Sequence, residues 1–248
     1  MIIVPGMEMD RGLPGPGVHC HHIVSIGPAR EDGNGFEQDQ RFDSGWISRP
    51  QETQAMLDML HENGNLTVYC HPEWSGTAAR DFDMLRGNFA MEVWNTGCAV
   101  EDGLDVDNGW LWDDLLSRGQ KIWGVATDDG HAMDQHCLGW VMVNAENDVA
   151  SILDALKAGA FYSSCGPEIY DFRVEDGRAY VECSPVSRIQ FRQFNIPYHM
   201  VLGEGITRGD IALRRSSSAQ YIRAVVVDSL GRRAWTNPIF LDDADLAN

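Results

Sequence analysis

Several titratable side chains stand directly after short apolar runs in the sequence. They are Glu8 after residues 2–4, His71 after residues 66–70, and Asp129 and His131 after residues 122–126. If these runs are strands of one parallel sheet, their carboxyl ends meet at one edge, where α/β proteins bind ligands. Carboxylate and imidazole are ligands that divalent transition metals accept. The sequence therefore predicts a metal site assembled from strand ends that lie far apart along the chain.

A further source of ligands is the histidine-rich segment at residues 19–22. His22 directly precedes the apolar stretch 23–26, and His19 and His21 stand close enough to compete for the same role. A single histidine at such a place is more often a hydrogen-bonded turn or core residue than a ligand, and Asp-Asp-Gly is commonly a turn. The joint placement of these residues, and not any one of them, favours a metal site.

Short apolar runs alternate with helical patterns through residues 65–164. Buried strands are expected at residues 66–70, 89–94, 121–126 and 161–163. Helices are expected at residues 51–62, 78–86, 110–118 and 150–158, where apolar residues recur at helical spacing and a glycine follows. This alternation predicts an α/β domain over residues 1–164 with a mostly parallel sheet or barrel.

The pattern of the sequence changes after residue 164. Glu175-Asp176-Gly177 stands between two strand-like runs, which is typical of a hairpin. Further strand-like runs occupy residues 189–194 and 221–227, with no helical pattern between them. We expect a small β-rich, sandwich-like domain over residues 165–248.

The charge of the chain argues against some kinds of partner. Among its 248 residues, 19 Lys and Arg stand against 37 Asp and Glu, which gives a net charge of −18. Such a surface repels phosphate backbones and anionic lipids, so we expect neither general nucleic-acid binding nor membrane binding. No apolar run is long enough for a membrane span, the first residues lack a signal-peptide pattern, and the six cysteines form no C-x-x-C pair. These features predict a cytoplasmic protein with free thiols.

The order of the motifs resembles the PHP superfamily, the polymerase and histidinol phosphatase domain. The resemblance covers residues 2–164. It rests on Pro5-Gly6-Met7-Glu8, on residues 22–27, on His71-Pro72 and on residues 126–131, which end in Asp129-Gly130-His131. It implies a distorted (β/α) barrel that binds several divalent ions, typically Mn, Zn or Fe, and hydrolyses phosphate esters.

Carried over to this sequence, the resemblance implies a metal-ligand set of Glu8, His22, His71, Asp129 and His131. Glu8 would bridge two ions, and Glu8, Asp129 and His131 would also act in catalysis. The family pattern opens with a strand that ends in His-x-His, and no such motif precedes residue 2. The fold expected is therefore an incomplete PHP-type barrel. We expect a second copy of the chain, as a homo-oligomer, or the β-rich tail to cover the open edge.

The expected function is that of a metal-dependent phosphoesterase, in which a metal-activated water attacks a small phosphorylated substrate. Arg30, Arg41 and Arg49, in the polar loop at residues 27–50, are candidates for holding the phosphate. Two alternatives stand beside this hypothesis. One is a catalytically lapsed PHP-like module that binds one metal ion or ligand. The other is an amidohydrolase-like metal hydrolase that acts on C–N or C–O bonds.

Overall fold

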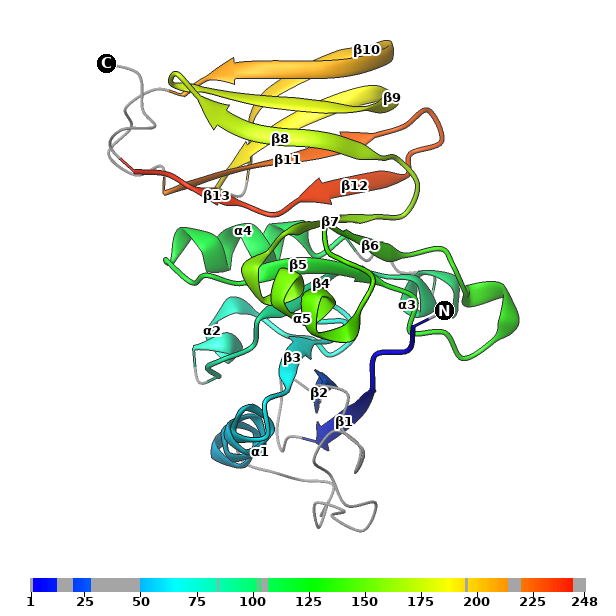
Figure 1. Cartoon of the computed structure of the whole chain (residues 1–248), viewed down its shortest axis with the longest axis vertical. Coiled ribbons are helices and arrows are strands. Elements are labelled where there is room, and N and C mark those ends of the chain that lie inside the picture. The colour runs from blue at the N-terminus through cyan, green and yellow to red at the C-terminus, as the bar shows by residue number, and fades with distance from the viewer. Residues whose placement is uncertain are drawn as a thin grey trace.

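The computed structural model describes residues 2–12, 20–27, 50–83, 85–101, 103, 107–194, 196–213 and 220–242. Its strands form two sheets, which Figure 1 shows stacked one above the other. The first sheet has the order β1-β2-β3-β4-β5, with β1, β2 and β3 antiparallel and β3, β4 and β5 parallel. Its strands are β1 Gly6–Gly12, β2 Cys20–Ile26, β3 Leu66–Tyr69, β4 Ala90–Asn95 and β5 Trp123–Thr127.

The second sheet is antiparallel and follows the order β10-β9-β11-β12-β7-β6, while β8 pairs with β9 and β13 with β11. Its strands are β6 Trp140–Val143, β7 Phe161–Ser164, β8 Ile169–Glu175, β9 Arg178–Gln193, β10 Ile196–Ala212, β11 Tyr221–Val227, β12 Arg233–Thr236 and β13 Ile239–Phe240. The predicted hairpin is confirmed: Glu175 pairs with Arg178, and Asp176 and Gly177 both have positive φ, as a tight type I′ turn requires.

The helices cover and separate the sheets. They are α1 Pro50–Glu62, α2 Ala79–Phe82, α3 Thr96–Glu101, α4 Gly109–Ser117, α5 Val149–Ala158 and the short 3₁₀ helix η1 Met133–Gln135. The helix predicted at residues 51–62 is present as α1; of the apolar stripe expected on it, Met56 and Leu60 are buried, Met59 is half-buried and Ala55 is exposed. Helix α2 is shorter than the predicted 78–86. None of the helices in the described ranges combines the length and apolar character needed to cross a bilayer.

The expected incomplete (β/α) barrel is wrong. The described chain is mostly β, with 44% in strands and 22% in helices, and the sheets are curled and antiparallel over most of their pairings. Residues 2–4, expected to be a strand that ends before Glu8, form none, and Glu8 lies inside β1 instead. The predicted strand at 161–163 exists as β7, but it pairs with β6 and β12 in the second sheet.

Side chains of the second sheet explain why the parallel set stops at β5. Ser163 Oγ accepts a hydrogen bond from Ala126 N and donates one to Gly124 O, at 3.1 and 2.8 Å. Asn237 Oδ1 accepts a hydrogen bond from Gly124 N at 3.2 Å. These bonds satisfy backbone groups on the outer edge of β5 that a sixth parallel strand would need. The second sheet thus contains strands from both sides of residue 164.

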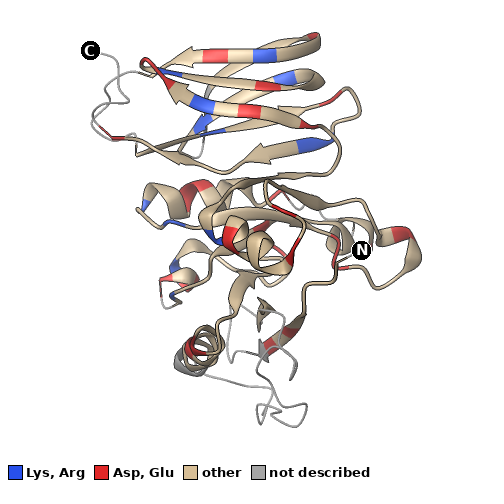
Figure 2. Cartoon of the chain, in the orientation of Figure 1, with Lys and Arg blue, Asp and Glu red and all other residues tan. Residues whose placement is uncertain are grey.

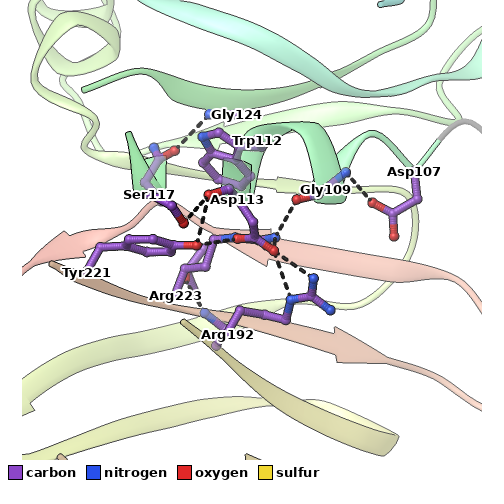
Figure 3. Close-up of polar contacts among 12 residues, drawn as sticks. Asp107, Gly109, Trp112, Asp113, Ser117, Gly124, Arg192, Tyr221 and Arg223 are labelled. Atoms are coloured by element: carbon purple, nitrogen blue, oxygen red, sulfur yellow. Dashed lines mark hydrogen bonds and ion pairs between the residues drawn. The ribbon is translucent and has the colours of Figure 1, made fainter. Parts of the chain in front are cut away.

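A buried ion-pair cluster joins the two layers. Helix α4 lies between the sheets in Figure 1, and its Asp113 is fully buried. Figure 3 shows the Asp113 carboxylate between Arg192 of β9 and Tyr221 and Arg223 of β11. Arg223 Nε donates to Asp113 Oδ1 at 2.7 Å, Arg192 Nη2 to Oδ2 at 2.6 Å and Tyr221 Oη to Oδ1 at 2.9 Å. The Arg223 guanidinium also stacks 4.6 Å from the Trp112 ring.

We predict that Asp113→Asn lowers the free energy of unfolding by about 3–5 kcal/mol, because it leaves two arginine charges without their counter-charge at a buried contact. The matched control is Asp114→Asn, one residue along the same helix. Asp114 makes a partly exposed pair with Arg118 at 3.3 Å, so its loss should cost less than about 1 kcal/mol. Urea denaturation of the two variants checks this. Equal losses would show that the Asp113 cluster does not hold the layers together.

Candidate metal centre

Three side chains from three separate segments meet at one point of the first sheet. They are Glu8 of β1, His22 of β2 and His71, which follows β3. His22 Nδ1 lies 2.8 Å and His71 Nε2 3.4 Å from Glu8 Oε1. One ligand atom from each residue lies within 4.8 Å of the other two. The predicted meeting of Glu8 and His71 is therefore present in the structure.

The alternation of the strands selects His22 over its neighbour His21. Asp10 of β1 pairs with His22 of β2, and Glu8 lies two residues from Asp10, so these three side chains share one face of the sheet. His21 points to the opposite face, where it is buried and bonds the Tyr69 hydroxyl at 2.6 Å. Burial lowers the pKa of His21 to about 4. His21 is thus a neutral core residue, while His19 lies outside the described residues.

Buried groups behind the sheet edge hold His71 in place. Its backbone N–H donates to Glu92 Oε2 at 2.6 Å, and its Nδ1 lies 3.3 Å from Ser75 Oγ, so Nε2 is left to face Glu8. The backbone angle φ of His71 is 24°, a value that residues other than glycine rarely adopt. Strained backbone of this kind concentrates at functional sites, where the surrounding contacts enforce it.

Asp129 lies beside the triad formed by Glu8, His22 and His71. Its Oδ2 lies 4.0 Å from His71 Nε2 and accepts a hydrogen bond from Asn95 Nδ2 at 3.1 Å. Asp129 also has positive φ, 47°. Gly97 lets this loop come close, because a Cβ at Gly97 would meet the Asp129 carbonyl oxygen at 2.6 Å. Asp128 fixes the other side of the loop by accepting hydrogen bonds from the backbone of residues 137–139.

His131 lines the same pocket but does not belong to the three-residue group. Its backbone N–H donates to Gln135 Oε1 at 2.6 Å, and Gln135 Nε2 donates to Glu101 at 2.7 Å. Of the five predicted ligands, the structure brings three into direct proximity, places Asp129 next to them and leaves His131 exposed at the pocket wall. Arg30, Arg41 and Arg49 lie outside the described residues.

The pocket around the triad has a volume of about 440 Å³ and a strongly acidic wall. Four carboxylates line it, from Glu8, Asp10, Glu101 and Asp129. Among the described residues of this wall there is no lysine or arginine. The rings of His22, His71 and Trp74 pack together, with the indole centre 5.4 and 5.0 Å from the two imidazole centres. The electrostatics of the wall favour a cation over an anion.

The donor set fits a divalent transition metal. Imidazole nitrogen and carboxylate oxygen bind zinc at about 2.0–2.2 Å, so tetrahedral ligands stand about 3.4 Å apart. The separation of 3.4 Å between His71 Nε2 and Glu8 Oε1 equals that value, and the separation of 2.8 Å between His22 Nδ1 and Glu8 Oε1 is shorter, as a hydrogen bond is. His22 and Glu8 would therefore move apart slightly to hold one ion between them. A possible metal-binding group is therefore present at Glu8, His22 and His71, three of the residues that the sequence predicts.

The charges of Glu8 and His22 are coupled. Hydrogen bonds from His22 and His71 lower the pKa of Glu8 to about 2, although burial opposes this. Burial favours the neutral form of His22, but hydrogen bonds to Cys20 and Glu8 outweigh it and raise the pKa of His22 to about 10. Near neutral pH an imidazolium therefore faces a carboxylate at 2.8 Å. The proton of this pair sits where a metal ion would replace it.

Glu92, whose carboxylate holds the strand ends at the site together, was not predicted from the sequence. It lies inside the apolar strand β4, is 2% exposed, and accepts hydrogen bonds from His71 N, Asn95 Nδ2 and Thr127 Oγ1. Burial raises its pKa. The available signal was a carboxylate in an otherwise apolar strand. Trp74 also lines the pocket and is 44% exposed there.

A comparison with protein-family models finds none that matches the chain, and a comparison with curated proteins finds no significant match. The assignment of the site therefore rests on its geometry.

We predict that divalent-ion binding releases at least one proton, because His22 must lose its proton to become a ligand. Affinity should then rise about tenfold per pH unit between pH 6 and 8, below the His22 pKa of about 10. Calorimetric titration of Zn²⁺ in buffers of different ionisation enthalpy counts the protons. Binding without proton release would contradict the assignment of His22, and His199→Ala, on the remote strand β10, should behave as the unaltered chain does.

Proposed function

We propose that this chain is a metal-dependent phosphoesterase whose ion is held by Glu8, His22 and His71. The observation that carries the proposal is the convergence of one carboxylate oxygen and two imidazole nitrogens within 4.8 Å. They meet in an open pocket that also contains Asp129 and His131. Pockets in which perturbed titratable groups converge are where catalytic sites are expected.

The metal would be Mn, Zn or Fe, since two nitrogens and a carboxylate suit these ions better than Mg²⁺ or Ca²⁺. Bound by Glu8 Oε1, His22 Nδ1 and His71 Nε2, it would lower the pKa of a water and stabilise negative charge on a phosphoryl oxygen. Glu8 suits the role of ligand because its low pKa keeps the carboxylate ionised at neutral pH.

The residues beside the triad suit proton transfer. Asp129 Oδ2 is held by Asn95 Nδ2 at 3.1 Å, and within the described residues its Oδ1 makes no hydrogen bond. Asp129 can therefore take a proton from the attacking water. His131, exposed on the pocket wall, is placed to donate a proton to the leaving oxygen. The resemblance to the PHP superfamily supports phosphate esters as the substrate class, since the same five residues carry it.

A module that binds one ion without catalysis is the second candidate. Two observations favour it. In the described part of the chain, one group of three metal-ligating side chains has its ligand atoms within 4.8 Å of one another, and it consists of Glu8, His22 and His71. The described pocket wall also offers four carboxylates and no lysine or arginine that would hold a phosphate.

We predict that Glu8→Gln and His71→Ala each weaken ion binding by more than about 100-fold, because loss of even an orienting partner of a ligand costs 10–100-fold. Hydrolysis of p-nitrophenyl phosphate with Mn²⁺, Zn²⁺ or Fe²⁺ should fall to background in both variants. The control is His199→Ala, which removes an exposed imidazole from β10.

Elemental analysis and turnover together separate the candidates. A bound ion with phosphate release supports the phosphoesterase. A bound ion without turnover under any of the three metals contradicts catalysis and supports the single-ion module. A chain that binds none of these ions contradicts both.

A further inference from the structure

A second pocket lies at the other end of the first sheet's strands from the metal centre. Its charged side chains are mainly basic, whereas those of the metal centre are mainly acidic. It has a volume of about 390 Å³ and is lined by residues 82–83, 85–88 and 118–122. The first two segments precede β4 and the third precedes β5, so the pocket lies at the amino ends of strands whose carboxyl ends point to the metal centre. Six residues of β4 span about 20 Å, which separates the two places.

Three cations line this pocket, Arg86, Arg118 and Lys121. Arg86 Nη1 donates only to the carbonyl oxygens of Phe82 and Leu85, at 3.3 and 2.8 Å, so its charge is not neutralised by a carboxylate of the described chain. Figure 2 shows basic positions around α2 and beyond the end of α4, beside acidic ones on the same helices.

The other two cations differ in how they are held. Lys121 Nζ lies 5.2 Å from the centre of the Phe240 ring and, within the described ranges, forms no ion pair. Arg118 does have acidic neighbours, Asp83 at 3.6 Å and Asp114 at 3.3 Å, and its side chain is 47% exposed. Two of the three positive charges therefore have no carboxylate partner among the described residues, and the third shares its charge with two aspartates.

The loop that carries Arg86 is built rigidly. Gln54 of α1 clamps the Arg86 backbone, accepting from its N–H at 2.7 Å and donating to its carbonyl oxygen at 3.2 Å. Gly87 has a φ of 95°, and a Cβ there would overlap the His61 ring at 2.3 Å. The positive φ and the close approach of the His61 ring both favour glycine at this turn. A cation on such a loop is held close to one position, which lowers the entropy lost on binding a ligand.

An unused hydrogen-bond acceptor accompanies the cations. Asn88 lines the pocket, and its Oδ1 is buried without a hydrogen-bond partner among the described residues. A buried acceptor left unpaired costs free energy, so a ligand with a hydroxyl donor would satisfy it. An oxyanion that also carries an O–H group therefore fits the pocket better than a carboxylate does.

We propose that this pocket binds a phosphate group, either as the free ion or as the terminal group of a small phosphate ester. Arg86, Lys121 and Arg118 supply N–H donors to the phosphoryl oxygens, and the P–O–H or an adjacent hydroxyl donates to Asn88 Oδ1. Charge-assisted bonds of this kind are about twice as strong as neutral ones. At physiological ionic strength charges are screened beyond about 8 Å, so this local cluster attracts an anion despite the net charge of −18. The proposal is independent of the function assigned to the metal centre.

The test is calorimetric titration of the full chain, freed of metal with EDTA, with inorganic phosphate and separately with glycerol 3-phosphate. We expect saturable binding that Arg86→Gln and Lys121→Gln each weaken at least tenfold. The matched control is Arg208→Gln, which removes one exposed positive charge from β10 of the second sheet and should leave the affinity unchanged. Circular dichroism confirms that each variant is folded, and either pocket variant alone suffices for the comparison.

The possible results divide clearly. Tighter binding of glycerol 3-phosphate assigns the pocket to a phosphate ester, and tighter binding of inorganic phosphate assigns it to the free ion. No saturable binding up to about 20 mM of either compound, which is weaker than about −2.3 kcal/mol, overturns the proposal. Equal weakening by Arg208→Gln also overturns it, because the anion would then be responding to net charge alone.

Discussion

The buried carboxylate of Glu92 is the interaction on which the candidate metal centre depends. It accepts hydrogen bonds from the backbone of His71 and the side chains of Asn95 and Thr127, which lie at the ends of three neighbouring strands. Burying a carboxylate costs several kcal/mol unless its oxygens are paired. A shift of any of the three strands would remove a donor, so the cost of burial keeps their ends in one arrangement. Asp113 acts in the same way between the two layers of the fold.

The sequence predicts local structure better than it predicts pairing. The strand at residues 66–70 and helix α1 follow from their apolar periodicity, and the hairpin at residues 175–178 follows from its turn residues. Strand β7 has the same local pattern as a strand of a parallel sheet, but it pairs with β6 and β12, and side chains of Ser163 and Asn237 bind the backbone on the outer edge of β5. Such a decision depends on contacts between distant residues, which periodicity does not contain.

The candidate site was predictable where it depends on residue type and on strand alternation. Glu8, His22 and His71 combine ligand chemistry with positions at or near strands, and the side-to-side alternation of β2 separates His22 from the buried His21. The role of Glu92 was not predictable in this way. Its donors are the backbone N–H of His71, the side-chain amide of Asn95 and the hydroxyl of Thr127, and no sequence pattern marks these groups. The apolar residues around Glu92 predict only an ordinary buried strand.

The pockets at the two ends of the first sheet's strands differ in charge. At the carboxyl ends of the strands, carboxylates such as Glu8 and Asp129 share a pocket whose described wall has no lysine or arginine. They repel one another unless protons or a cation lie between them, and the raised pKa of His22 places an imidazolium beside Glu8 at neutral pH. At the amino ends, Arg86, Arg118 and Lys121 line the second pocket. Each end of the strands therefore gathers charge mainly of one sign. A bound cation at the carboxyl ends and a bound anion at the amino ends would neutralise these charges.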